Sequence, residues 1–245
     1  MPHPSPAVRF SLPPTATLST GVASWSGAIG ALPTAPRLKL LHLVRHAQGW
    51  HNVDPEGVSR VPSGLDARLT PEGERQCAAL SAVAAKLQPE VIVSSPLMRT
   101  LQTAALSFGG QLRAGVPLVA LEDCRETVNY LCDSRRPLSV NVAELAASGI
   151  AVDTAGCPHE HDELWASYER RHGPQEAFAA HRESADLPGL AVRARSAFAW
   201  LGARPERELA LVSHSAFFMN TLNMARVGRA AGVAPLVDST CMVCF

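Results

Sequence analysis

The sequence has 245 residues, of which 47% are hydrophobic, so it is long enough to bury the core of one catalytic domain without disulfide bonds. Its 22 basic and 22 acidic residues cancel, which argues against a strongly basic surface for nucleic acid or for a membrane. No stretch approaches the roughly 18 continuous apolar residues of a membrane span.

The first 37 residues differ in composition from the rest of the chain. They hold seven prolines, nine serines or threonines and no acidic residue. Such a segment cannot bury enough surface to fold alone, so it is a disordered extension or an organelle transit peptide. We expect residues 38–245 to form one catalytic domain of an intracellular protein, either cytoplasmic or organellar.

Two apolar runs, residues 39–44 and 208–213, each lead towards a histidine, His46 and His214. A third apolar run, residues 91–94, leads into a helix with an arginine in its first turn. In open α/β sheets ligands bind outside the carboxyl ends of the strands. We therefore expect four side chains to meet at one edge of the sheet: Arg45, His46, Arg99 and His214.

This set of side chains suits a phosphoryl group. Guanidinium groups bind phosphate oxygens in pairs, and a neutral imidazole can attack phosphorus to form a covalent intermediate. Each of these residues alone would be a structural residue or a solvated strand end. Their occurrence together at three equivalent strand ends favours phosphate chemistry.

Helices are predicted between the strands. Thr70 caps and Pro71 opens a helix that runs to about Leu87, and Ser95 and Pro96 open the next one. Apolar residues share one face in this second helix and in a later one: Leu97, Leu101, Ala104, Ala105 and Phe108, then Leu190, Ala194, Ala197, Phe198 and Leu201. The order predicts a three-layer, doubly wound α/β fold with a mostly parallel sheet. The mostly polar residues 129–187 are expected to form an inserted, mainly helical cap over the pocket.

Six cysteines show no spacing typical of a disulfide framework, so we expect free thiols in a reducing compartment. The pair Cys241 and Cys244 lies in an apolar run and is interpreted as part of an edge strand. The ligand-rich segment with Cys157, His159 and His161 raises the alternative of a zinc site, but its proline and charged flanks favour a polar loop. No metal and no cofactor are expected.

Five segments, taken in order, resemble the histidine phosphatase superfamily, which is also called phosphoglycerate mutase-like. The matching residues are Leu43-Val44-Arg45-His46-Ala47-Gln48 with Asn52, Asp66 to Gly73 with Gln76, Ser94 to Ala104, Arg125-Glu126, and Val212-Ser213-His214-Ser215. The Arg-His-Ala-Gln-x-x-His-Asn form and the later Asp133-Ser134-Arg135-Arg136 are most similar to a plant, algal and fungal branch of that superfamily.

The resemblance implies a role for each matched residue. His46 would become phosphohistidine, and Arg45, Arg99 and His214 would hold the phosphoryl oxygens. Glu126 would donate a proton to the leaving group, with Glu122 and Asp123 as nearby alternatives. Asn52 would be a secondary phosphate contact.

Arg135 and Arg136 are adjacent basic residues in the expected cap. One of them would bind an anionic part of the substrate remote from the scissile phosphate, and the alternative is a solvated charged turn.

The chain departs from the family pattern at Ala47, where glycine is usual, and it lacks both the fuller mutase signature and the His-Asp pair of the acid phosphatase branch. These departures favour a metal-independent phosphomonoesterase that hydrolyses a phosphorylated small molecule or phosphoprotein. The alternatives are phosphoglycerate mutase-type transfer and a non-catalytic phospholigand-binding module. Neither nucleic acid nor a membrane is an expected partner, and the sequence leaves the oligomeric state open.

Overall fold

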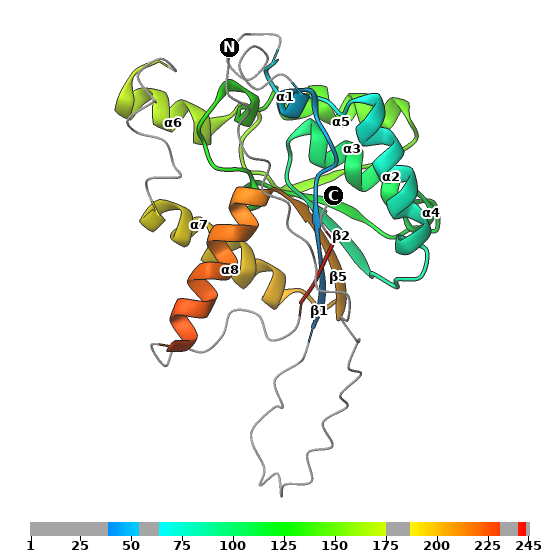
Figure 1. Ribbon diagram of the computed structural model, residues 1–245. Coiled ribbons are helices and arrows are strands. Elements are labelled where there is room, and N and C mark those ends of the chain that lie inside the picture. The colour runs from blue at the N-terminus through cyan, green and yellow to red at the C-terminus, as the bar shows by residue number, and fades with distance from the viewer. Residues whose placement is uncertain (1–38, 54–63, 175–186, 231–239, 244–245) are drawn as a thin grey trace, which may run out of the picture. The chain divides into compact units, whose positions relative to one another are not determined.

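In the part of the chain that the structure describes, six parallel strands form one sheet in the order β4-β3-β2-β5-β1-β6 (Figure 1). This computed structural model describes residues 39–53, 64–174, 187–230 and 240–243. The strands are β1 (Leu40–Arg45), β2 (Val91–Ser94), β3 (Leu118–Leu121), β4 (Asp153–Gly156), β5 (Glu208–Ser213) and β6 (Thr240–Val243).

Eight α-helices are described between or beside these strands. They are α1 (Trp50–Val53), α2 (Pro71–Ala84), α3 (Met98–Ser107), α4 (Gly109–Arg113), α5 (Leu138–Ala147), α6 (Glu163–His172), α7 (Leu187–Ala203) and α8 (Ser215–Ala230). Thr70 caps α2 as predicted, because its Oγ1 accepts from the N–H of Gly73 (3.0 Å) and Pro71 begins the helix. The helix ends at Ala84, one turn earlier than expected.

The strand order explains which face each helix covers. From β1 to β4 the chain moves across the sheet in one direction, and then it returns to β5 and β6 in the other. Because crossovers between parallel strands are right-handed, this reversal places α2, α3 and α5 on one face and α7 and α8 on the other (Figure 1). The predicted doubly wound α/β fold is confirmed.

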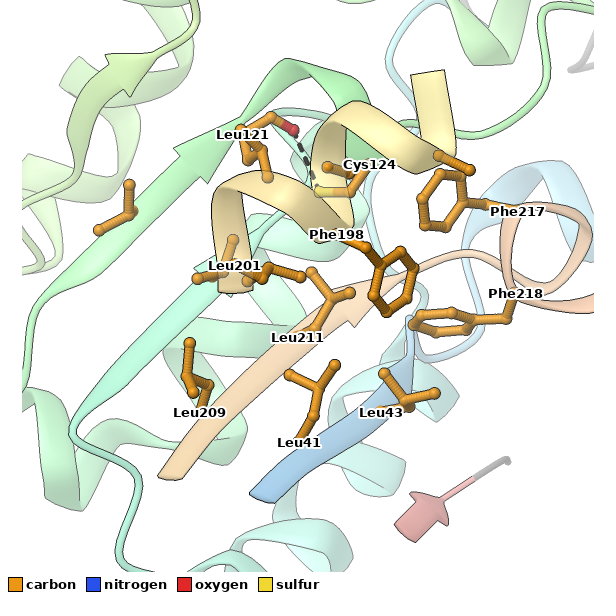
Figure 2. Close-up of a cluster of buried hydrophobic side chains, with 14 of the residues drawn as sticks. Leu41, Leu43, Leu121, Cys124, Phe198, Leu201, Leu209, Leu211, Phe217 and Phe218 are labelled. Atoms are coloured by element: carbon orange, nitrogen blue, oxygen red, sulfur yellow. Dashed lines mark hydrogen bonds between the residues drawn. The ribbon is translucent and has the colours of Figure 1, made fainter. Parts of the chain in front are cut away.

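Both faces of the sheet are buried under apolar side chains. Figure 2 shows one layer, in which Phe198 and Leu201 of α7 and the two phenylalanines of α8 pack on leucines of β1 and β5. The opposite layer joins the other face of β1, β2 and β5 to Leu80 of α2 and to Leu101, Ala104 and Phe108 of α3 and its end. Burial on both faces is why these strands are continuous apolar runs in the sequence.

The segment expected to form the cap contributes instead in part to the sheet. Strand β4 pairs with β3 as an edge strand, and Leu145 of α5 packs in the core beneath the sheet. The partly exposed residues of β4 carry no apolar run, so no strand is predicted there from the sequence. Among the described helices of that segment, only α6 lies outside the sheet layers. The N-cap residue of α6 is Asp162, whose Oδ1 accepts from the N–H of Trp165 (2.8 Å).

Three further expectations can be placed. Cys241 lies in the edge strand β6 beside β1, as interpreted, whereas Cys244 lies outside the described residues. The interpretation of the first 37 residues also falls outside them. Cys77, Cys124, Cys132 and Cys157 are buried free thiols. Within the described ranges, no helix is long and apolar enough to cross a membrane.

Candidate active site

His46 directly follows β1 at the carboxyl edge of the sheet. Its backbone N–H donates to the carbonyl of Ser213 (2.9 Å), which continues the β1–β5 pairing to the base of the ring. Nδ1 lies 2.7 Å from the carbonyl oxygen of Ala47. Because a carbonyl only accepts, Nδ1 carries the proton and Nε2 carries the lone pair. The ring is thus held in the tautomer that a nucleophile at Nε2 requires.

The backbone after His46 is fixed by side chains of α2 and α3. The N–H of Ala47 donates to Thr103 Oγ1 (3.0 Å), and the N–H of Gln48 donates to Gln76 Oε1 (2.8 Å). A Cβ on Gly73 would lie 2.2 Å from the carbonyl oxygen of Gln48, so only glycine permits this approach of α2. These contacts fix the position of the loop that carries His46.

His214 lies beside His46, with ring centroids 5.1 Å apart. It follows β5 and is fully buried, and its Nε2 lies 2.9 Å from Ser95 Oγ at the end of β2. The two histidines therefore meet because β1 and β5 are adjacent parallel strands in register. Ser95 is predicted from the sequence only to begin a helix, and in the structure its hydroxyl orients the His214 ring.

Arg99 enters this cluster from the first turn of α3 and is 1% exposed. Its Nη1 donates to the carbonyl of Cys132 (2.6 Å), and its Nη2 donates to Asp133 Oδ1 (3.2 Å). The buried Nε has no partner among the described residues, so an anion can bind there. The Asp133 partner was not identified from the sequence, since it lies 34 residues away.

The cluster is electrostatically suited to an anion. Burial and the charge of Arg99 hold the pKa of His46 and of His214 well below the usual value, and Arg45 adds to the effect on His46. Both imidazoles are therefore neutral at neutral pH. The guanidinium groups of Arg45 and Arg99 remain charged and would favour a phosphoryl dianion.

The side chain of Glu126 lies at the amino-terminal end of α8, the helix that begins directly after His214. Its Oε1 accepts from the N–H of Phe217 (3.1 Å), and its Oε2 accepts from the N–H of Ala216 (3.4 Å). Burial and the charge of Asp133 raise the pKa of Glu126, Arg99 partly offsets them, and the resulting pKa is about 7. A carboxyl group with this pKa can both give and take a proton near neutral pH.

The two alternative acids have other partners. Glu122 accepts from Arg125 (2.7 Å) and from Arg135 (3.1 Å), so it is part of a buried ion-pair network. Asp123 accepts from the hydroxyl of Ser196 on α7 (2.5 Å). The geometry therefore favours Glu126 among the three.

Arg193 of α7 braces the loop that carries Glu126. Its Nη1 donates to the carbonyls of Asp123 (3.0 Å) and Arg125 (2.7 Å), and its Nη2 donates to that of Glu126 (3.4 Å). The guanidinium also lies over the ring of Phe217, 5.6 Å from its centroid. No local sequence pattern distinguished this arginine from others on the helix.

Arg135 lies in a buried polar network, and its expected contact with substrate stays a prediction. Its side chain is fully buried, and every N–H is used by Glu122 or by backbone carbonyls of residues 136, 159, 160 and 161. Arg136 pairs with Glu144 (3.0 Å) and lies 3.6 Å from Asp66. Adjacent basic residues are visible in the sequence, but the carboxylates and carbonyls that fold against them are not.

Asn52 and His51 lie at the start of the chain segment that follows the His46 loop. The Asn52 side chain is exposed, and its Oδ1 accepts from the N–H of Gly49 (3.0 Å). It thus stabilises the turn into α1, and its contact with a phosphoryl group stays a prediction. His51 belongs to a motif of the sequence but had no predicted role, and its ring lies beside that of His46.

Among the described residues, no group of three or more His, Cys, Asp or Glu side chains is arranged to hold a metal ion. The segment that raised the zinc alternative is a loop whose carbonyls at His159 and His161 accept from Arg135. Cys157 is buried, and burial raises the pKa of its thiol to about 12, which disfavours the thiolate that zinc requires.

Comparison with known proteins agrees with this geometry. A family model described as histidine phosphatase superfamily (branch 1) matches residues 41–135. Phosphoglycerate mutase-like protein 1 of Arabidopsis thaliana is 33% identical over 222 residues, covering 76% of this chain and 72% of the relative. A second Arabidopsis thaliana relative, a phosphoglycerate mutase-like protein, is 34% identical over 220 residues and covers 76% of this chain and 74% of its own length.

A third relative matches a shorter part. The glucosyl-3-phosphoglycerate phosphatase of Mycolicibacterium vanbaalenii is 38% identical over 91 residues, which is 37% of each chain. The family match, the two relatives aligned over most of their length and the histidine-arginine cluster agree with one another. The chain belongs to the histidine phosphatase superfamily, in its phosphoglycerate mutase-like branch.

Proposed function

We propose that this protein is a metal-independent phosphomonoesterase that works through a phosphohistidine on His46. The observation that carries the proposal is the tautomer of His46, whose Nε2 carries the lone pair and whose ring lies beside that of His214 and in the field of Arg99. A neutral imidazole is a competent nucleophile, and burial together with Arg99 keeps the pKa of His46 low enough for it to be neutral.

In the first step, Nε2 of His46 attacks phosphorus and the bond from phosphorus to the leaving oxygen breaks. Glu126, protonated, gives its proton to that oxygen, so the product leaves as an alcohol. In the second step, water attacks phosphorus and gives its proton to the Glu126 carboxylate. The bond from phosphorus to Nε2 breaks, which releases inorganic phosphate and restores the free imidazole.

The guanidinium groups of Arg45 and Arg99 supply the positive charge that stabilises the transferred group. In this position they perform the task that a divalent cation performs in metal-dependent phosphatases. His214 neighbours the nucleophile and can donate to a phosphoryl oxygen from Nδ1, a buried atom with no partner among the described residues. This charge supply supports catalysis without a metal.

The relatives support the same reaction class. One is named as a phosphatase of a phosphorylated sugar acid, and two are named as phosphoglycerate mutase-like proteins. Hydrolysis and mutase-type transfer share the phosphohistidine and differ only in whether water or a second hydroxyl takes the phosphoryl group.

The experiment uses the purified full chain with a panel of phosphomonoesters. Rapid acid-free quenching should trap a base-stable, acid-labile phosphoenzyme, and His46→Ala should abolish it and lower turnover about 10³-fold or more. EDTA should leave the rate unchanged. Exchange between 2- and 3-phosphoglycerate without release of phosphate would favour the mutase, and activity retained by His46→Ala would refute both mechanisms.

A further inference from the structure

His51 is a partly buried imidazole that the mechanism above does not use. Its ring centroid lies 5.3 Å from that of His46, on the short helix α1, and the planes are inclined by 51°. His214 lies at 5.1 Å from the same ring. The nucleophile therefore has two further imidazoles as neighbours, which come from different elements.

The structure makes room for the His51 ring specifically. A Cβ on Gly49 would lie 2.7 Å from Nδ1 and 2.8 Å from Cε1 of His51, so the ring occupies the space that any other residue would fill. The turn is held by Asn52, whose Oδ1 accepts from the N–H of Gly49, and by Trp50, whose N–H donates to the carbonyl of Arg68 (3.0 Å). Asn52 thus fixes the turn, and the ring of His51 lies beside that of His46.

Nδ1 of His51 is buried and has no hydrogen-bond partner among the described residues. A buried polar atom of this kind is costly unless it gains a partner. The charged and titratable groups around the ring are Arg99 from α3, Arg45 from β1 and the imidazoles of His46 and His214. Burial and the charge of Arg99 lower the pKa of His51, so it is neutral before an anion binds.

We propose that His51 is a third imidazole of the phosphoryl site, which hydrogen-bonds the bound dianion and takes up a proton from solvent when that dianion binds. This inference rests on the proposed phosphoryl site. Electrostatics supports it: Arg99 lowers the pKa of His51 and already pairs with Asp133 (3.2 Å), and the charge of a bound dianion would act on the ring in the opposite sense. His51 is partly exposed, whereas His46 and His214 are 3% and 0% exposed, so solvent reaches His51 most readily.

The test measures tungstate binding to the full chain by calorimetry in two buffers of different ionisation enthalpy. Tungstate is a tetrahedral dianion that does not itself titrate near neutral pH, so proton uptake reports the protein. Wild type should take up a proton on binding. His51→Gln should lose that uptake and bind about 10- to 100-fold more weakly, the loss of a charged hydrogen bond. His159→Gln, at an exposed histidine, should match wild type.

Nitrogen-15 spectra of the histidine side chains provide a second measurement that does not depend on the variant's folding. In wild type, tungstate should shift the His51 nitrogens to imidazolium values, with His51→Gln used only to assign the signals. Unchanged affinity or unchanged proton uptake in a folded His51→Gln variant overturns the inference, and so does a His51 that stays neutral in the tungstate complex.

The proposed function can fail separately from this inference. If tungstate protonates His51 but no phosphomonoester is hydrolysed and no phosphoenzyme forms, the inference stands and the function does not. If a phosphoenzyme forms on His46 while His51→Gln binds tungstate as wild type does, the function stands and the inference does not.

Discussion

The carboxyl of Glu126 can be replaced by an amide of nearly the same shape in a Glu126→Gln variant. The pKa of Glu126 is raised by burial to about 7, so about half of the molecules carry the proton at pH 7 and about a tenth at pH 8. The value of kcat/KM for an alkyl phosphate should therefore fall about tenfold for each pH unit above 7. The variant cannot donate a proton at any pH, and this limb should disappear.

The size of the loss should depend on the leaving group. An alkoxide is strongly basic and needs the proton, so Glu126→Gln should lower kcat/KM for an alkyl phosphate by roughly 10²- to 10⁴-fold. Nitrophenolate leaves with little help, and its kcat/KM should fall by less than about tenfold. The assay compares kcat/KM because this constant covers only the steps up to the phosphoenzyme, whereas kcat also contains hydrolysis, in which Glu126 acts as the base.

The matched control is Asp123→Asn, which changes an acid on the same loop whose side chain accepts from Ser196. It should affect both substrates equally and leave the limb near pH 7 in place. Equal losses on the two substrates in Glu126→Gln, or a limb that persists in it, would refute the assignment of the proton donor.

Three further outcomes are expected. Arg193→Met should release the loop that carries Glu126 and lower kcat/KM for alkyl phosphates more than for nitrophenyl phosphate, in the same sense as Glu126→Gln but less; equal effects would show that the brace has no catalytic consequence. Arg135→Ala should lower the free energy of unfolding by about 3 to 5 kcal/mol in urea titrations, because it removes a buried guanidinium that pairs with Glu122 and donates to four backbone carbonyls, and a loss confined to KM would contradict this. Burial lowers the pKa of His46 and His214, so the unfolded chain binds more protons than the folded protein below about pH 6.5; the urea midpoint should fall between pH 7 and 5.5, and by less in His214→Asn.

The sequence alone determined the strands that carry the candidate site. Where both faces of a parallel strand are covered, its residues are continuously apolar, and the polar residues that follow mark the carboxyl end. His46 and His214 were placed beside each other on this basis, because parallel strands end at one edge. Arg99 followed from its position in the first turn of the helix after β2.

The tertiary structure decided what no local pattern encodes. Arg135 and Arg136 looked alike in the sequence, yet loops 25 residues further along the chain return to enclose the first, while the second pairs with carboxylates nearer the surface. The edge strand β4 has no apolar run, and its backbone hydrogen bonds to the single neighbouring strand β3 hold it in the sheet. The ring of His51 lies beside that of His46, in space that a side chain on Gly49 would narrow. Such contacts depend on where distant segments meet, and that is set by packing of the whole domain rather than by neighbours in the chain.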